Sequence, residues 1–245
     1  MTINSLTTSL KEWPKGIRLY IALATLLVTA EVYWYTNTVY DGSSLAAIRL
    51  QEIYAWIALS LLLISVSIGP AYKTFTKIPG KSLLFDARRM LGVSAAWFAS
   101  LHVLISYFDQ FGGANPFKLP DAYKLAFAVG LIALLVLLAM TATSFNAAFR
   151  KLGIWWFRIH RLVYLAILLI LFHAFNIGVH ASTLPFIVAL VTVVGLIFAM
   201  HFYLMFGTKG KPATNLQSLT LCYGLLLTVS VFAFGITQGG QNVLR

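Results

Sequence analysis

The segment FRIHRLVYLAILLILFHAFNIGVH, Phe157–His180, combines a long apolar run with three histidines. His160 lies between two arginines, His173 lies within the apolar run, and His180 follows its end. About 20 apolar residues in a helix are enough to cross roughly 30 Å of hydrocarbon. Ionisable side chains are costly in a bilayer and usually have a function or a polar partner there. The segment therefore predicts a transmembrane helix whose histidines have a function or a polar partner.

The composition of the whole chain also indicates a membrane protein. Of its 245 residues, 60% are hydrophobic and 10% are charged, and a water-soluble fold cannot cover so much apolar surface with so few charges. We predict an all-α integral membrane protein with a single transmembrane domain, residues 1–245. The first apolar run is too long and too aromatic at its end for a cleaved signal peptide. The seven predicted spans are Ile17–Thr36, Ile53–Tyr72, Met90–Phe111, Tyr123–Thr143, Phe157–Gly178, Leu184–Phe206 and Leu216–Ile236.

The net charge of +11 is explained by topology rather than by binding to nucleic acid. Fourteen of the 18 basic residues fall at the start of the chain or in alternate connections, which the positive-inside rule places on the inner side. This bias predicts an inside N-terminus and an outside C-terminus, with attraction to anionic lipids as a secondary effect. The fourteen are Lys11, Lys15, Arg18, Lys73, Lys77, Lys81, Arg88, Arg89, Arg150, Lys151, Arg158, Arg161, Lys209 and Lys211.

The connections and the cysteine content restrict the possible redox chemistry. Every connection is too short for a nucleotide-binding domain, and the chain has no GxGxxG or P-loop motif. The single cysteine, Cys222, excludes a CxxCH haem attachment and a cysteine-ligated iron–sulfur cluster within this chain. Any electron donor or acceptor is therefore a small molecule, a lipid-soluble carrier or another polypeptide. Non-covalent haem remains compatible with the sequence.

His102 and His173 are predicted to lie at the same depth on parallel helices. His102 follows Arg89 by 13 residues and His173 follows Arg158 by 15, which corresponds to about 20 and 22 Å of helical rise. Two imidazoles that face each other at equal depth can supply both axial ligands of a b-type haem in an apolar helical bundle. This pair is the first candidate site.

Two further histidines have alternative interpretations. His160 lies about 20 Å below His173, a separation that suits a second haem. On an ideal helix the two side chains point about 140° apart, so a shared face requires distortion or different partners. His160 is alternatively an interfacial histidine in contact with a lipid phosphate or a quinone. His201, about 12 Å above Lys209, either meets His160 or forms a hydrogen bond near a helix end.

Two segments together resemble a known family. They are SLLFDARRMLGVSAAWFASLHVLISY, Ser82–Tyr107, and RKLGIWWFRIHRLVYLAILLILFHAF, Arg150–Phe175. The shared pattern is RRxLG, then LH ten residues after the glycine, then RKLG, then IH and a histidine thirteen residues later. It resembles the ferric-reductase-like transmembrane superfamily and, within it, the haem-binding membrane subunits of bacterial methionine sulfoxide reductase systems (the MsrQ or YedZ type). The similar region spans over half of the chain.

The resemblance implies haem ligands residue by residue. In the wider superfamily two haems are stacked between the third and fifth helices, each held by one histidine from each helix. The outer pair corresponds to His102 and His173. The inner pair corresponds to His160 and the position of Arg88, and arginine does not replace histidine as a haem ligand. An inner haem would then need His201, another side chain or a single axial ligand; alternatively Arg88 and Arg89 bind a propionate or the head group of a quinone or flavin.

The sequence and the resemblance together predict a b-type cytochrome in a prokaryotic cytoplasmic membrane. Its haem-binding core would cover about residues 50–206, and the additional helix, about 216–236, would contact other membrane subunits. Electrons would pass from an inner-side quinol or flavin (FMN) reductase, through one or two haems, to an outer-side acceptor such as a periplasmic methionine sulfoxide reductase. The alternatives are a structural or assembly subunit of a larger complex, and a transporter or channel, which the absence of internal repeats disfavours.

Overall fold

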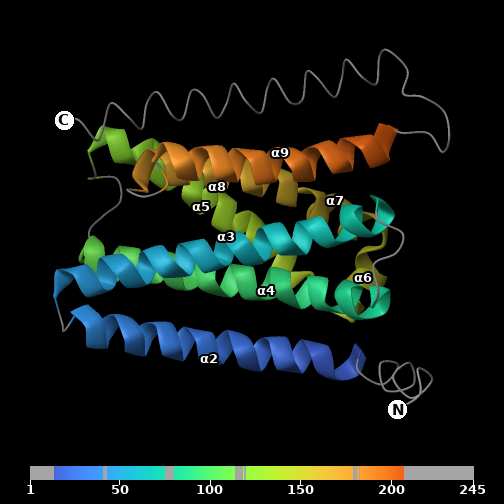
Figure 1. The fold of residues 1–245 in the computed structure, drawn as a ribbon, viewed down its shortest axis with the longest axis horizontal. Helices are drawn as coiled ribbons and strands as arrows, with labels where there is room; N and C mark the ends of the chain where they lie inside the picture. The colour runs from blue at the N-terminus through green and yellow to red at the C-terminus, as the bar shows by residue number, and fades with distance from the viewer. Residues whose placement is uncertain are drawn as a thin grey trace.

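The computed structural model describes residues 14–40, 43–74, 80–113, 118, 120–178, 181 and 183–206. Over these residues the main elements are helices that run roughly along one long axis (Figure 1). In chain order they are α2 (Pro14–Tyr40), α3 (Ser44–Thr74), α4 (Lys81–Ile105), the π-helical turn η1 (Ser106–Gln110), α5 (Asp121–Ala142), α6 (Asn146–Leu152), α7 (Ile154–Arg161), α8 (Val163–Ile177) and α9 (Leu184–Phe206).

The helices confirm the predicted membrane architecture over the described residues. Five segments are long and apolar enough to cross a bilayer, and each coincides with one of the first five predicted spans. They are Gly16–Tyr40, Leu45–Pro70, Leu83–Asp109, Tyr123–Ala142 and Ile154–Ile177. The sixth predicted span is α9, in which the strongly apolar stretch is the shorter Phe186–Ala199. The seventh, 216–236, lies outside the described residues. The chain is a multi-pass integral membrane protein.

The bundle is built from a few close helix pairs. α3 packs along α4, α5 packs along α8, α2 lies against α3 and α4, and α9 lies against α3. α4 and α8 are not a close pair, although both contribute to one core. That core contains Leu62, Val66, Ala95, Ala96, Leu137, Ala166, Ile167, Leu171 and Val194. Small residues face it from α4 and larger aliphatic ones from α3, α5 and α8, so side chains of unequal size fill the interior.

α2 is the most peripheral helix, and polar contacts fix it to α4. Ser94 is only 1% exposed, and its hydroxyl lies 2.7 Å from that of Thr25. Because the Thr25 hydroxyl donates to the Ile21 carbonyl, Ser94 is the donor in this contact. Further along, Trp97 Nε1 donates to Thr29 Oγ1 at 3.0 Å. Such hydrogen bonds between helices are favourable in a bilayer because apolar lipid offers no competing partner.

Two of the confirmed spans are not regular α-helices throughout, and both irregularities lie near histidines. The predicted span Phe157–Gly178 consists of two helices, α7 and α8. Between them the Leu162 N–H bonds to the Ile159 carbonyl at 3.0 Å, which makes a tighter i→i−3 turn. The prediction Met90–Phe111 ends in η1, where the wider π-helical turn follows α4. Single π-helical turns within membrane helices frequently mark functional sites.

The α2–α4 contact gives a first prediction. Ser94→Leu is expected to destabilise the protein by about 1–3 kcal/mol, because the larger side chain overpacks a closed helix interface. Ser94→Ala removes one interhelical hydrogen bond and should cost only about 0.6 kcal/mol. Thr192→Leu is the matched control, since Thr192 is exposed on α9 and its hydroxyl bonds only to Val188 of the same helix. Thermal unfolding in detergent measures all three, and equal melting temperatures for Ser94→Leu and Thr192→Leu would contradict the prediction.

Candidate functional site

His102 on α4 and His173 on α8 come together in the interior of the bundle. Their ring centroids are 6.2 Å apart and the ring planes are nearly perpendicular, at 86°. The two helices run in the same direction, as the predicted span order requires. The predicted equal depth of the two histidines is therefore confirmed. The two rings are neighbours, edge to face, between helices that are not themselves in close contact.

The hydrogen bonds of this pair fix which nitrogen of each ring carries the proton. His102 Nδ1 lies 2.9 Å from the backbone carbonyl of Gln51 on α3, and His173 Nδ1 lies 2.8 Å from that of Ala126 on α5. A carbonyl only accepts, so each Nδ1 is protonated and donates. The neutral ring then keeps a lone pair on Nε2. Metal-binding histidines typically show this arrangement, with one nitrogen bound to a carbonyl and the other available to the metal.

Gly130 makes room for His173 against α5. A Cβ atom added to this glycine would lie 2.5 Å from Nδ1 and 2.8 Å from Cε1 of His173. Gly130 follows Ala126 by one helical turn, so the ring lies over the same surface of α5 as the carbonyl that it binds. The missing side chain therefore lets the imidazole reach the helix backbone. We did not identify Gly130 from the sequence, although an isolated glycine within an apolar helix does indicate a close approach.

Gln51 connects the His102 side of the site to η1. Its backbone carbonyl accepts the His102 Nδ1 proton, and its side-chain Oε1 accepts a hydrogen bond from the Ser106 hydroxyl at 2.5 Å. Gln51 is 8% exposed, so both contacts are largely shielded from solvent. One residue of α3 thus holds the ring on α4 and the π-helical turn that follows it. Gln51 was not predicted from the sequence either, because nothing near it in the chain pairs it with a histidine.

His160 lies in a separate aromatic and basic cluster at the α6–α7 end of the bundle. Its ring is stacked on Trp156, with centroids 3.8 Å apart. Its Nδ1 donates to the Trp156 carbonyl at 3.0 Å, and its Nε2 lies 3.4 Å from Ser144 Oγ. His160 therefore has the same proton arrangement as the other two histidines. Its Nε2 has one long contact with a hydroxyl and faces no described histidine.

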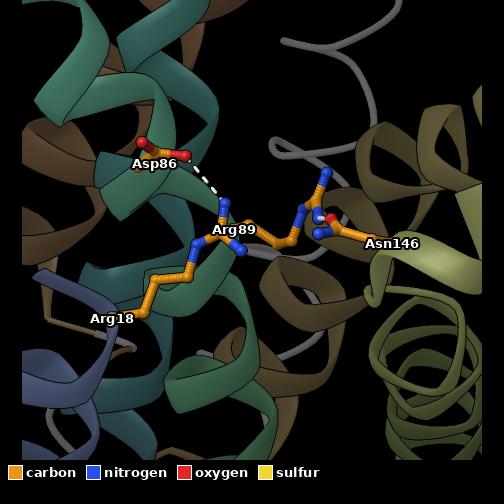
Figure 2. A network of polar contacts seen from close by, with 4 residues as sticks. All are labelled: Arg18, Asp86, Arg89 and Asn146. Carbon is orange, nitrogen blue, oxygen red and sulfur yellow. Dashed lines mark hydrogen bonds and ion pairs between the residues drawn. The ribbon is translucent and has the colours of Figure 1, made fainter. Parts of the chain in front are cut away.

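The adjacent arginines Arg88 and Arg89 have different neighbours. Arg89 donates to Asn146 Oδ1 at 2.6 Å and lies over the Trp156 ring at 5.9 Å. Figure 2 shows this contact beside the Arg18–Asp86 ion pair, whose closest N–O distance is 2.7 Å. Arg88 instead extends along α3, where a Cβ added to Gly69 would be 3.4 Å from its Nη1.

Arg89 and His160 both contact the Trp156 ring, so they belong to one end of the bundle, as predicted. His201 lies on α9 with its side chain outside the described part of the structure, and His180 lies outside the described residues altogether.

The Gly130–His173 contact predicts opposite effects for two glycine substitutions. Gly130→Ala should destabilise the protein by about 1–3 kcal/mol, because the new methyl group displaces the His173 ring from the Ala126 carbonyl. Gly195→Ala on α9 is the control, since a Cβ there meets nothing within 4 Å. It should be neutral or stabilising by about 0.5–1 kcal/mol, because alanine favours helix over glycine. Thermal unfolding of both variants tests this, and a neutral Gly130→Ala would show that the ring does not need this space.

Comparisons with known proteins identify the family of the chain. The family model described as "Ferric reductase like transmembrane component" matches residues 53–171, a range that includes His102 and His160 and ends before His173. The haem-binding subunit MsrQ of a protein-methionine-sulfoxide reductase from Klebsiella pneumoniae is 31% identical over 181 residues, which is 73% of this chain and 88% of that protein. The MsrQ subunit from Cronobacter sakazakii is 33% identical over 127 residues, or 51% of this chain and 61% of that protein.

One of the similar proteins is much longer than this chain. The magnetosome protein MamZ of Magnetospirillum gryphiswaldense is 32% identical over 139 residues, which is 56% of this chain but 21% of MamZ. No solved structure matches the chain significantly. The family model and the extent of the MsrQ matches show that the chain belongs, with the MsrQ proteins, to the ferric-reductase-like family of transmembrane proteins.

Proposed function

We propose that this protein is a membrane b-type cytochrome that binds haem through His102 and His173 and transfers electrons across the bilayer. The observation that carries the proposal is the facing pair of rings, 6.2 Å apart, each with its Nδ1 proton bound to a backbone carbonyl. The MsrQ relatives, which are named as haem-binding subunits, support the choice of haem.

The donor set fits a haem iron. His102 and His173 would hold the iron through their Nε2 atoms, because each Nδ1 proton is already bound to a backbone carbonyl. Within the described residues no group of three His, Cys, Asp or Glu side chains is placed to hold a metal ion. Two imidazoles are what a six-coordinate haem takes from its protein, because the macrocycle supplies the other four nitrogens.

The residues around the pair would perform three tasks. The carbonyls of Gln51 and Ala126 hold a proton at each Nδ1, which orients the rings and makes each Nε2 a better donor. Gly130 leaves space for the His173 ring. The buried alanines of α4 and aliphatic residues of α8 provide an apolar, low-dielectric surrounding, which influences the reduction potential. When bound, haem supplies a one-electron couple, and the protein contributes ligation and orientation.

The direction of transfer follows from the charge distribution. Arg89, Arg18 and the α6–α7 segment lie at the same end of the bundle, and the positive-inside rule assigns that end to the inner side. The electron donor would be a quinol or a flavin reductase that acts at this end, near Arg88, Arg89 and His160. The acceptor would be an outer-side protein such as a methionine sulfoxide reductase, in keeping with the names of the relatives.

The second candidate is a structural subunit that retains this fold within a larger complex. The 21% coverage of MamZ supports it, because there the matching region is one part of a much longer protein. Haem content separates the two functions, since a structural subunit needs no redox group.

Reduced-minus-oxidised absorption spectra of the detergent-purified protein test the proposal. We expect a b-type spectrum in the wild type and its loss or strong reduction in His102→Ala and His173→Ala, because each variant removes one axial donor. A wild type that remains colourless after expression with ample haem would contradict the electron-transfer function and favour the structural one.

His160→Ala is the matched control, since it also removes a partly buried histidine with a carbonyl-bound Nδ1. We expect it to keep the spectrum of the His102–His173 site. A fall in haem per chain from two to one, measured as the pyridine haemochrome, would assign a second haem to His160. Complete loss of haem in this variant would contradict the assignment of the first site to His102 and His173 alone.

A further inference from the structure

The α6–α7 corner, residues 146–161, follows α5 and includes the first residues of the span Ile154–Ile177, so it lies where a membrane span begins and therefore near a membrane surface. α5 ends at Ala142 immediately before it, and α8 begins at Val163 immediately after it. Figure 1 shows α6 and α7 together at one end of the bundle. This position does not depend on which side of the membrane that end faces.

The corner carries four cations without acidic partners in the described structure. Arg150, Lys151, Arg158 and Arg161 are all exposed. The chain has no aspartate or glutamate after Asp121, so the whole region around the corner is free of acids in sequence. The three ion pairs within the described residues all use other side chains. Four positive charges are therefore exposed, and none of them forms an ion pair with a carboxylate of the described residues.

α7 has two faces of different chemistry. Its inner face packs against the bundle and its outer face is exposed, and these terms do not refer to the sides of the membrane. On the inner face Trp156 donates through Nε1 to the Thr143 carbonyl at 2.9 Å and stacks on His160. On the outer face Ile154 is 67% and Trp155 59% exposed, and the Arg158 guanidinium lies over the Trp155 ring at 4.6 Å. A helix with basic residues and exposed tryptophan on its outer side is typical of an element that lies in the lipid head-group region.

We propose that the outer face of the α6–α7 corner binds the phosphate head groups of anionic phospholipids. The exposed aromatic side chains place this segment at head-group depth, because tryptophan concentrates at the membrane–water interface. The neighbouring cations then lie at the level of the lipid phosphates, which would provide the negative charge that no described carboxylate supplies to them. The same apolar residues disfavour an acidic soluble protein as the occupant, since they would have to leave the lipid to meet it. The inference does not require haem.

Lipid binding by the full-length, detergent-purified protein tests this proposal. Phosphatidylglycerol and phosphatidylcholine with identical acyl chains are titrated separately, and native mass spectrometry counts the bound lipids. We expect a preference for phosphatidylglycerol that weakens roughly tenfold or more in Arg158→Gln/Arg161→Gln, since each basic residue near the surface contributes to the attraction. Arg150→Gln/Lys151→Gln provides a second, independent variant from α6. Raising the salt concentration should reduce the preference in the wild type.

The matched control is Lys118→Gln/Lys124→Gln, which removes two exposed cations at the opposite end of α5 from the corner. It should retain the wild-type preference, and all variants should keep the wild-type melting temperature. An unchanged preference in both corner variants, or an equal loss in the control, would overturn the proposal. A third result would also overturn the proposal. If a corner variant still binds phosphatidylglycerol but no longer co-purifies with a soluble acidic protein, that protein is the occupant of the corner.

Discussion

The hydrogen bonds from His102 and His173 to backbone carbonyls are the interactions on which the central site depends. Gln51 and Ala126 belong to α3 and α5, so each histidine is held by a helix other than its own. The closely packed pairs α3–α4 and α5–α8 are the pairs within which these bonds form. Helix packing and ring orientation therefore depend on each other. A change in the packing of α3 on α4, or of α5 on α8, would change which ring nitrogen is left free.

The bilayer explains why the polar contacts of this protein are so specific. An unsatisfied polar group is costly in hydrocarbon, so the hydroxyls of α2, α3 and α4 donate within their own helix or to a neighbouring one. The same rule applies to His102, His160 and His173, each of which donates its Nδ1 proton to a backbone carbonyl. The charged side chains concentrate instead toward the helix ends, where Arg18 pairs with Asp86 and Arg89 binds Asn146.

The His102–His173 pair and His160 have different surroundings. The His102–His173 pair lies deep in the bundle with apolar neighbours, whereas His160 lies among arginines and tryptophans beside the membrane surface. The tighter turn at Leu162 separates α7 from α8. The segment that carries His160 is therefore part of the α6–α7 corner and not of the bundle core. An electron carrier of the proposed kind needs both environments, an apolar one for its redox group and a polar one where a donor can bind.

The sequence by itself determined the membrane class, the first five spans and the pairing of His102 with His173. It could do so because span length and helical rise depend only on the distance along the chain. It did not reveal Gln51, Ala126 or Gly130, since their roles arise from backbone atoms and from an absent side chain on helices distant in sequence. The break at Leu162 was also not apparent, because neither proline nor glycine marks it. Only the tertiary structure decided which carbonyl each ring meets, because that depends on how neighbouring helices are rotated and how closely they approach.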